Sequence, residues 1–219
     1  MKPASRRTGR PRKDDDRAAA RERLLDAAHE LMCERSTIDV PLLEIALRAG
    51  LNVALVNYYF GSKDGMLLQM AMRHQSNYAA VLQRLLEADY PGAAKLGLHI
   101  RGMVRAFRRV PYLQRLQHKI LRDSSEEEAR QVAVALIQPL AEFYRQLVAQ
   151  GVADGSLKPV DPMHLHITIV GACDMLYSGS ASLAHGFGVY GVDDALSAAY
   201  SEHLVALVMQ GIGREPPPA

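Results

Sequence analysis

Apolar residues recur about every 3.6 positions along most of the chain, whereas β-branched and polar residues do not alternate over any long run. This pattern predicts an all-α fold. The first apolar stripe ends near Arg35, and Pro41 suits the first turn of a short second helix that stops at Gly50. Asn52 is a good N-cap for a third short helix, which Gly61 ends.

Longer helices are predicted in the rest of the chain. Ser62 caps a fourth helix, which Pro91 closes, and further helices are expected over 93–109, 112–122, 126–149, 162–181 and 194–210. Pro139 should kink the helix over 126–149. The glycine-rich segment 179–191 is expected to be the main internal loop.

Basic charge is concentrated at one end of the chain. Residues 1–13 contain six basic residues and no acid, whereas the rest contains 20 basic and 24 acidic residues. Three aspartates at 14–16 follow this basic start instead of an apolar stretch, and no apolar run approaches the roughly 18 residues of a membrane-spanning helix. We therefore expect a cytoplasmic protein without a membrane partner.

Cysteine and histidine are not spaced as metal ligands. Cys33 and Cys173 lie far apart and outside any C-x-x-C pattern, so neither a disulfide framework nor a zinc site is predicted. His164 and His166 stand two positions apart on a predicted helix, where their side chains point to different faces. We expect no metal, no cofactor and no catalytic residue.

The second and third helices form a candidate helix-turn-helix motif over about 41–60. Ala46 is small where the two helices must cross, Gly50 leaves the turn unhindered, and Val56 can fill the core from the second helix of the pair. A plain helical hairpin is the alternative. The spacing favours the DNA-binding motif.

Residues around this motif resemble a known family. The segments RERLLDAA at 21–28, EIA at 44–46, AGL at 49–51 and NYYFGSKDGML at 57–67 are similar to the N-terminal domain of TetR/AcrR-family transcriptional regulators. The resemblance covers about 17–73. It implies a homodimer whose third helices enter the major groove of double-stranded DNA at the half-sites of an imperfect palindromic operator.

Four positions depart from the family's frequent residues. Val40 stands in place of a threonine, Val53 of a lysine, Ser36 of a glycine and Tyr59 of a histidine. These departures weaken the inference of individual DNA contacts from the family. They do not weaken the inference of the fold.

Helical geometry divides the third helix into two sides. If Val56 points inward, steps of 100° per residue place Ala54, Asn57 and Tyr58 on the opposite side, with Val53 at the N-terminal lip. The amide of Asn57 can pair with an adenine edge, and small apolar side chains can meet a thymine methyl. The polar groups at both ends of the helix suit phosphates. The predicted DNA contacts are Arg10, Arg12, Asn52, Val53, Ala54, Asn57, Tyr58, Tyr59 and Lys63.

Arg10 and Arg12 belong to a basic N-terminal arm. With Gly9 and Pro11 they resemble the core of an AT-hook, in which an arginine enters a narrow A·T-rich minor groove. The alternative is a solvated basic tail that adds only non-specific attraction. The sequence leaves both interpretations open.

An effector pocket and a dimer interface are expected in the C-terminal part. Aromatic and apolar residues on neighbouring helices predict the pocket, and Asp174 is its polar candidate because a carboxylate in an apolar run needs a partner, a cavity or an interface. Small residues beside the last helix predict a four-helix interface. The pocket residues are Met103, Phe107, Tyr112, Phe143, Asp174 and Tyr177, and the interface residues are Gly171, Leu196, Tyr200, Leu204 and Leu207.

These elements predict four parts: an arm at 1–16, a DNA-binding domain at 17–77, an effector and dimerisation domain at 78–212 and a disordered tail at 213–219. The expected function is ligand-responsive transcription regulation, as a repressor released by a small, largely apolar effector. Two alternatives remain: a ligand-independent DNA binder that uses the arm, and an all-α enzyme in the C-terminal domain. No nucleophile–base pair supports an enzyme.

Overall fold

The computed structural model describes residues 13–123 and 125–213, and the described chain is helical, as predicted. Its one β feature is an isolated bridge between Leu157 and Gly213. The helices are α1 (Lys13–Arg35), α2 (Leu42–Ala49), α3 (Ala54–Phe60), α4 (Lys63–Glu87), α5 (Gly92–Arg109), α6 (Leu113–Asp123), α7 (Glu126–Leu136), α8 (Gln138–Ala153), α9 (Pro162–Ser178), α10 (Ser180–Phe187) and α11 (Asp194–Ile212).

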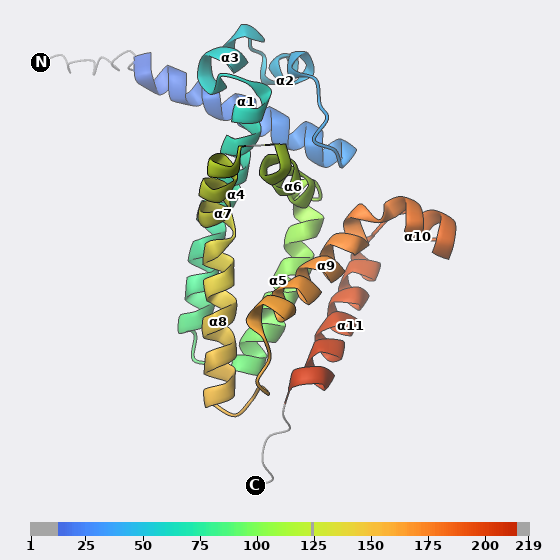
Figure 1. Cartoon of the computed structure of the whole chain (residues 1–219). Helices are drawn as coiled ribbons and strands as arrows, with labels where there is room; N and C mark the ends of the chain where they lie inside the picture. Colours follow the sequence, from blue (N-terminus) through green and yellow to red (C-terminus); the bar gives the residue numbers. More distant parts are fainter. Residues whose placement is uncertain (1–12, 124, 214–219) are drawn as a thin grey trace, which may run out of the picture.

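Two hydrophobic cores lie along the molecule. Helices α1, α2 and α3 surround the first core at one end, together with the first half of α4 (Figure 1). The second half of α4 joins α5, α8, α9 and α11 around the second core. Helix α4 is thus the element that runs through both.

Helices α6 and α7 complete the first core although they follow α5 in the chain. Tyr112 and Leu116 are completely buried there, and Val132 and Leu136 of α7 belong to the same cluster. The end of the molecule formed by α1, α2 and α3 is therefore packed directly against a segment from the second half of the sequence. The predicted domain boundary at 77 and 78 lies within α4 and stays a prediction.

Local signals set most helix ends. Gly50 adopts a left-handed φ of 64° at the end of α2, where its N–H donates to helix carbonyls. Ser62 caps α4, because its hydroxyl accepts a hydrogen bond from the N–H of Gly65 at 3.0 Å. These ends agree with the sequence prediction.

Two predicted elements were wrong. The helix expected over 126–149 is broken into α7 and α8 rather than kinked, because Pro139 lies in the first turn of α8, where its missing N–H is harmless. The segment 179–191 is not simply a loop, since 180–187 forms α10, which ends at Gly188 with a φ of 70°. The glycines of this segment led to the prediction of a loop, although its alanine and leucine residues favour a helix.

Candidate nucleic-acid interface and pocket

Helix α3 exposes one side and buries the other. Val56 is completely buried in the first core, whereas Ala54, Asn57 and Tyr58 are exposed, with 62% of Tyr58 accessible. Val53 is 38% exposed at the start of the helix. The described structure therefore puts the predicted groove-facing residues together in solvent, and their contact with DNA stays a prediction.

Asn52 acts just ahead of α3. The N-cap is Val53 rather than Asn52, but the Asn52 Oδ1 atom accepts a hydrogen bond from the Ala54 N–H at 2.8 Å. The predicted cap is thus displaced by one residue, a shift within the usual uncertainty of helix ends. Through this hydrogen bond, Asn52 stabilises the first turn of α3.

Tyr59 has a packing role in the described structure. It is half-buried against the first core, and its ring lies 5.1 Å from that of Tyr58 in an edge contact. The Tyr59 ring also lies 6.3 Å from that of Phe60, over which the guanidinium of Arg21 sits at 5.5 Å. Tyr59 thereby supports the exposed ring of Tyr58.

Lys63 lies at the first position of α4 and is half-buried. Among the described residues no hydrogen bond or ion pair engages its ammonium group, which can therefore meet a phosphate beside the N-terminal amides of α4. Arg10 and Arg12, the other predicted basic contacts, lie outside the described residues.

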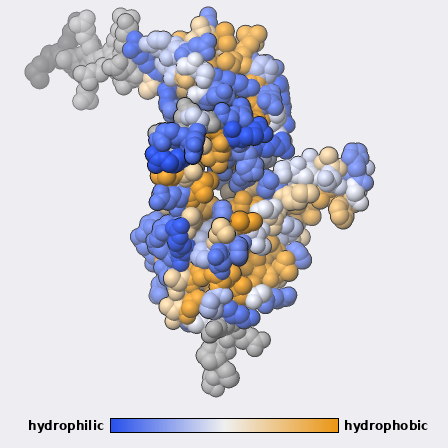
Figure 2. Space-filling model, in the orientation of Figure 1, coloured by the Kyte–Doolittle hydropathy of each residue, from blue (hydrophilic) through white to orange (hydrophobic). Residues whose placement is uncertain are grey.

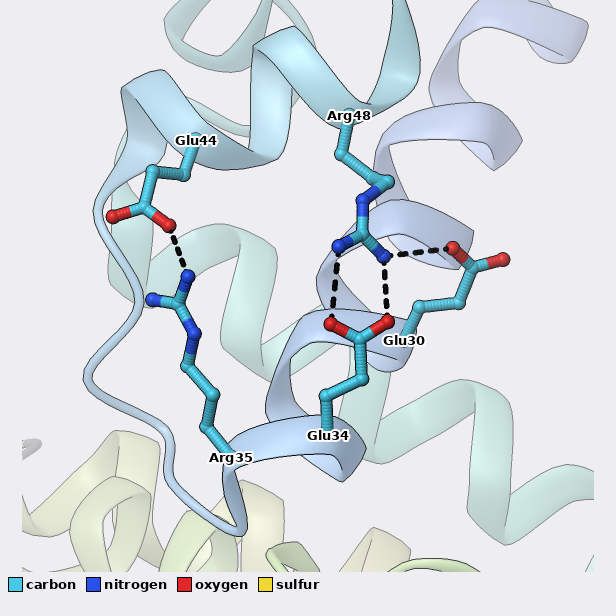
Figure 3. A network of polar contacts seen from close by, with 5 residues as sticks. All are labelled: Glu30, Glu34, Arg35, Glu44 and Arg48. Carbon is cyan, nitrogen blue, oxygen red and sulfur yellow. Dashed lines mark hydrogen bonds and ion pairs between the residues drawn. The ribbon is translucent and has the colours of Figure 1, made fainter.

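Ion pairs hold α2 on α1. Arg48 of α2 donates to both carboxylate oxygens of Glu34, at 2.8 and 3.0 Å, and approaches Glu30 at 3.4 Å (Figure 3). Arg35 pairs with Glu44 beside them. The hydrogen bond from Arg48 lowers the pKa of Glu34. These pairs are solvent-accessible, so each one mainly orients α2 and adds little stability.

Sequence reasoning missed this bracing. The available signal was the pair of glutamates four positions apart at 30 and 34, which share one face of α1. A second missed contact is the hydrogen bond from Arg23 to the carbonyl of Ala49, which ties α1 to the last residue of α2. Both depend on how the two helices cross.

The six predicted pocket residues are not brought together. Met103, Phe107 and Phe143 are buried in the second core, whereas Tyr112 is buried in the first, where its hydroxyl lies 2.8 Å from His29 Nδ1. Burial raises the pKa of Tyr112. Tyr112 is therefore separated from the predicted set, because the turn after α5 places it in the first core beside α1.

Asp174 and Tyr177 are half-buried near the end of α9. Asp174 accepts a hydrogen bond from Ser178 at 3.2 Å, and the Tyr177 hydroxyl shares one with Ser197 at 2.8 Å. Each polar group thus has a partner within the chain.

A cavity of about 320 Å³ lies between the two halves of the molecule and is called the junction pocket below. Of the predicted pocket residues, only Tyr177 lines it. Its wall is otherwise made by residues that sequence reasoning did not select: Cys33, Ser36, Arg108, Pro111, Leu176, Ser180, Leu183, Val189, Gly191 and Val192.

The second core contains a buried polar pair that the sequence also did not reveal. His99 Nε2 lies 2.9 Å from the Tyr144 hydroxyl, and burial lowers the pKa of His99 to about 3. His166, whose ring is 5.2 Å from that of Tyr144, has a buried Nδ1 atom without a hydrogen-bond partner in the described structure. Burial also lowers the pKa of His166. Both imidazoles are therefore neutral near pH 7.

The predicted interface residues fall into two groups. Gly171 and Leu207 are exposed on α9 and α11, while Leu196 and Tyr200 are half-buried, with the Tyr200 hydroxyl donating to the carbonyl of Ala172 at 3.0 Å. Leu204 is only 2% exposed and packs into the second core of its own chain.

Apolar side chains also gather on the outer face of α9 and α11 (Figure 2). Met163, Ile167 and Met175 are at least half exposed on α9. Among the described residues, no single helix is both long and apolar enough to cross a membrane, and α9 with α10 meets the length and composition together only across a bend of 71°.

Two family models match the chain. "Bacterial regulatory proteins, tetR family" matches residues 24–70, and "Tetracyclin repressor-like, C-terminal domain" matches residues 89–215. Among curated proteins, the HTH-type transcriptional regulators BetI of Brucella anthropi and Brucella suis are each 43% identical over 54 residues. That alignment spans 25% of this chain and 27% of each relative.

Solved structures share the fold over most of the chain. A TetR/AcrR-family regulator from Thermobifida fusca is 21% identical, with 88% of this chain and 98% of that chain covered and a TM-score of 0.64. FadR from Bacillus subtilis, solved in complex with stearoyl-CoA, is 20% identical, with 84% and 97% covered and a TM-score of 0.61. At these identities the likeness concerns the fold alone.

Proposed function

Because this chain belongs to the TetR family of DNA-binding transcriptional regulators, we propose that it binds a palindromic operator as a homodimer and represses transcription. A small, largely apolar effector would release it from DNA. The family consists of regulators rather than enzymes.

The exposed side of α3 is the observation that carries the proposal. Packing beneath this side fixes its shape. Buried Val56 anchors the helix, and the edge contact with Tyr59 holds the Tyr58 ring. Asn57 then presents an amide that can pair with adenine in the major groove. Tyr58 on α3 and Lys63 at the start of α4 supply groups for phosphates.

Dimerisation would use the exposed apolar face of α9 and α11. A two-fold interface brings the same residues of both copies together. Gly171 and Leu207 are exposed on this face and are therefore available for such a contact. Two recognition helices would then meet two half-sites about one helical turn of DNA apart.

Effector release requires two states with different DNA affinity. A ligand that prefers a geometry with mismatched recognition helices would shift the dimer away from DNA. The complex of FadR with stearoyl-CoA is a precedent, in a protein of the same fold, for a ligand with a long apolar chain.

Genome-wide selection of binding sites with the purified full chain would test this proposal. We expect enrichment of DNA fragments that share an inverted repeat, and the genes beside them would indicate the class of effector. Enrichment without any shared sequence would contradict operator binding and would favour a non-specific DNA binder.

A further inference from the structure

Residues from both halves of the molecule line the junction pocket. Cys33 and Ser36 contribute from the end of α1, Arg108 from the end of α5, and Leu176 from α9. Helix α10 and the segment after it form the outer wall. With about 320 Å³, the pocket is at the small end of the range of roughly 300–1,000 Å³ that ligand sites occupy.

The lining of the junction pocket combines apolar walls with one cation. Leu176, Leu183 and Val192 supply apolar surface. Among the described residues that line the pocket, Arg108 is the only charged one and none carries a carboxylate. Arg108 pairs with Asp194, but the Asp194 side chain is 86% exposed, so this ion pair is weak and leaves further N–H groups of the guanidinium for a ligand. A negatively charged group would be favoured at that end.

Helix α10 lacks packing that a ligand could supply. None of its residues is buried, and it ends in exposed Phe187, followed by exposed Tyr190. Figure 1 shows α10 projecting from the body of the molecule. Leu183 and Val189, which both line the pocket, are the residues through which this segment would gain apolar contacts.

We propose that the junction pocket binds a small amphipathic anion, with its apolar body against Leu176, Leu183 and Val192 and its carboxylate or sulfonate on Arg108. Met103, Phe107 and Phe143, which the sequence predicts as pocket residues, are poorer candidates because they are packed within the second core. The junction pocket, in contrast, is open at the surface beside α10.

Occupancy of this site would affect DNA binding through α1. The last turn of α1 lines the pocket, while Leu24, Ala28 and Leu31 of the same helix pack in the first core beside α3. A ligand that favours one position of α1 relative to α9 therefore changes the population of DNA-binding geometries. This regulatory step, unlike the binding itself, rests on the proposed function.

Binding can be measured with two dyes that share an aromatic body. Anilinonaphthalenesulfonate is an anion, and phenylnaphthylamine is its neutral counterpart. Arg108→Gln should weaken the anionic dye about 10-fold or more, as a lost charged contact implies, and leave the neutral dye unchanged. Leu183→Trp, which fills the pocket, should weaken both dyes. Arg105→Gln changes an exposed arginine of α5 outside the lining and should change neither.

Alkylation of the unaltered protein gives a second test that does not depend on variant folding. Cys33 lines the pocket and is partly exposed, whereas Cys173 is completely buried. The anionic dye should therefore slow alkylation of Cys33 by iodoacetamide. Unchanged alkylation, or equal loss of both dyes in Arg108→Gln, would overturn the anion site.

The link to DNA is tested separately with a selected operator fragment. The anionic dye should lower operator affinity of the parent chain about 5-fold or more, within the usual range of allosteric coupling, and should have no effect on Leu183→Trp. Absence of any specific operator would contradict the proposed function and leave the dye experiments intact. Dye binding in the pocket with unchanged operator affinity would overturn the regulatory step.

Discussion

Val56 and Asn57 are neighbours in the chain, yet one is completely buried and the other faces solvent. The rotation of about 100° per residue in a helix accounts for this difference. Because Val56 anchors α3 in the first core, the direction of Asn57 is set by packing rather than by the amide itself. Val56 therefore anchors the helix, and the base contact that we propose falls to its direct neighbour Asn57.

We expect Asn57→Ala to relax sequence preference at one base pair per half-site. The lost amide contact should cost about 1–3 kcal/mol of discrimination at that pair. Site selection with the variant and the parent would measure it, with Gln83→Ala, an exposed amide on the distant half of α4, as control. Identical preferences for Asn57→Ala and the parent would exclude base reading by Asn57.

His99 should make the protein sensitive to acid. Burial beside Tyr144 and near His166 lowers its pKa to about 3 in the folded state, whereas an unfolded chain takes up the proton near pH 6.5. The free energy of unfolding should therefore fall as pH drops below about 6.5, by up to about 1.4 kcal/mol per pH unit from this residue. The loss continues until the pH approaches the folded-state pKa.

Urea unfolding between pH 5 and about 7 would measure this slope. His99→Gln keeps a hydrogen-bonding side chain without a titrating group, so its slope should be shallower than that of the parent. His118→Gln, which changes an exposed histidine of α6, should keep the parent slope. A parent slope retained in His99→Gln would show that other groups cause the acid sensitivity.

Single helices depend on their ends. Gly50 terminates α2 with a φ of 64°, and a Cβ atom there would lie 3.0 Å from the Arg23 guanidinium that binds the Ala49 carbonyl. The turn of the helix-turn-helix motif therefore combines a left-handed backbone with a close side-chain contact.

Gly50→Ala should destabilise the chain by about 1–2 kcal/mol, the cost of a left-handed backbone with a Cβ atom. Gly102→Ala is a matched control, because Gly102 lies inside α5 with open space where a methyl group would stand, and there alanine should stabilise by about 0.5–1 kcal/mol. Denaturant midpoints would compare the two. Equal shifts would show that the turn does not require glycine.

The basic arm is expected to raise DNA affinity, either by non-specific charge attraction or by placing an arginine in the minor groove. Deleting residues 1–12 removes five basic residues and no acid. Each phosphate contact that is lost should reduce the log–log salt slope of operator affinity by about 0.9. Fluorescence anisotropy over a range of salt would measure the slope, and an unchanged slope would show that the arm does not contact DNA.

At the scale of the whole molecule, packed helices connect the two cores. Helix α4 runs through both, and α6 and α7 pack against the DNA-binding end while following α5 of the second core. Lys119 of α6 reaches Asp64 of α4 at 3.4 Å, next to Lys63. A change around the second core can therefore reach the DNA-binding end through packed helices.

Dimerisation is the whole-molecule property that the exposed face of α9 and α11 should provide. Leu207→Glu places a charge on a residue that is 56% exposed, and we expect dissociation to monomers with loss of operator binding. Val81→Glu changes a residue of α4 that is 48% exposed and should leave the dimer intact. Sedimentation velocity would distinguish them, and a dimeric Leu207→Glu would place the interface elsewhere.

The sequence by itself determined the all-α class, the helix-turn-helix motif and the helix ends at Gly50, Gly61 and Ser62. These features depend on periodicity and on hydrogen bonds between residues a few positions apart, so local residue types suffice to predict them. The same reasoning predicted which side of α3 is exposed.

Only the tertiary structure decided which residues from distant segments contact one another or share a cavity. Tyr112 is buried beside α1 instead of joining Phe143, and Arg48 braces α2 on α1. Arg108 and Leu183, from separate helices, both line the junction pocket. These contacts depend on how helices far apart in the chain cross, and helix crossings are selected by the packing of complete faces rather than by local signals.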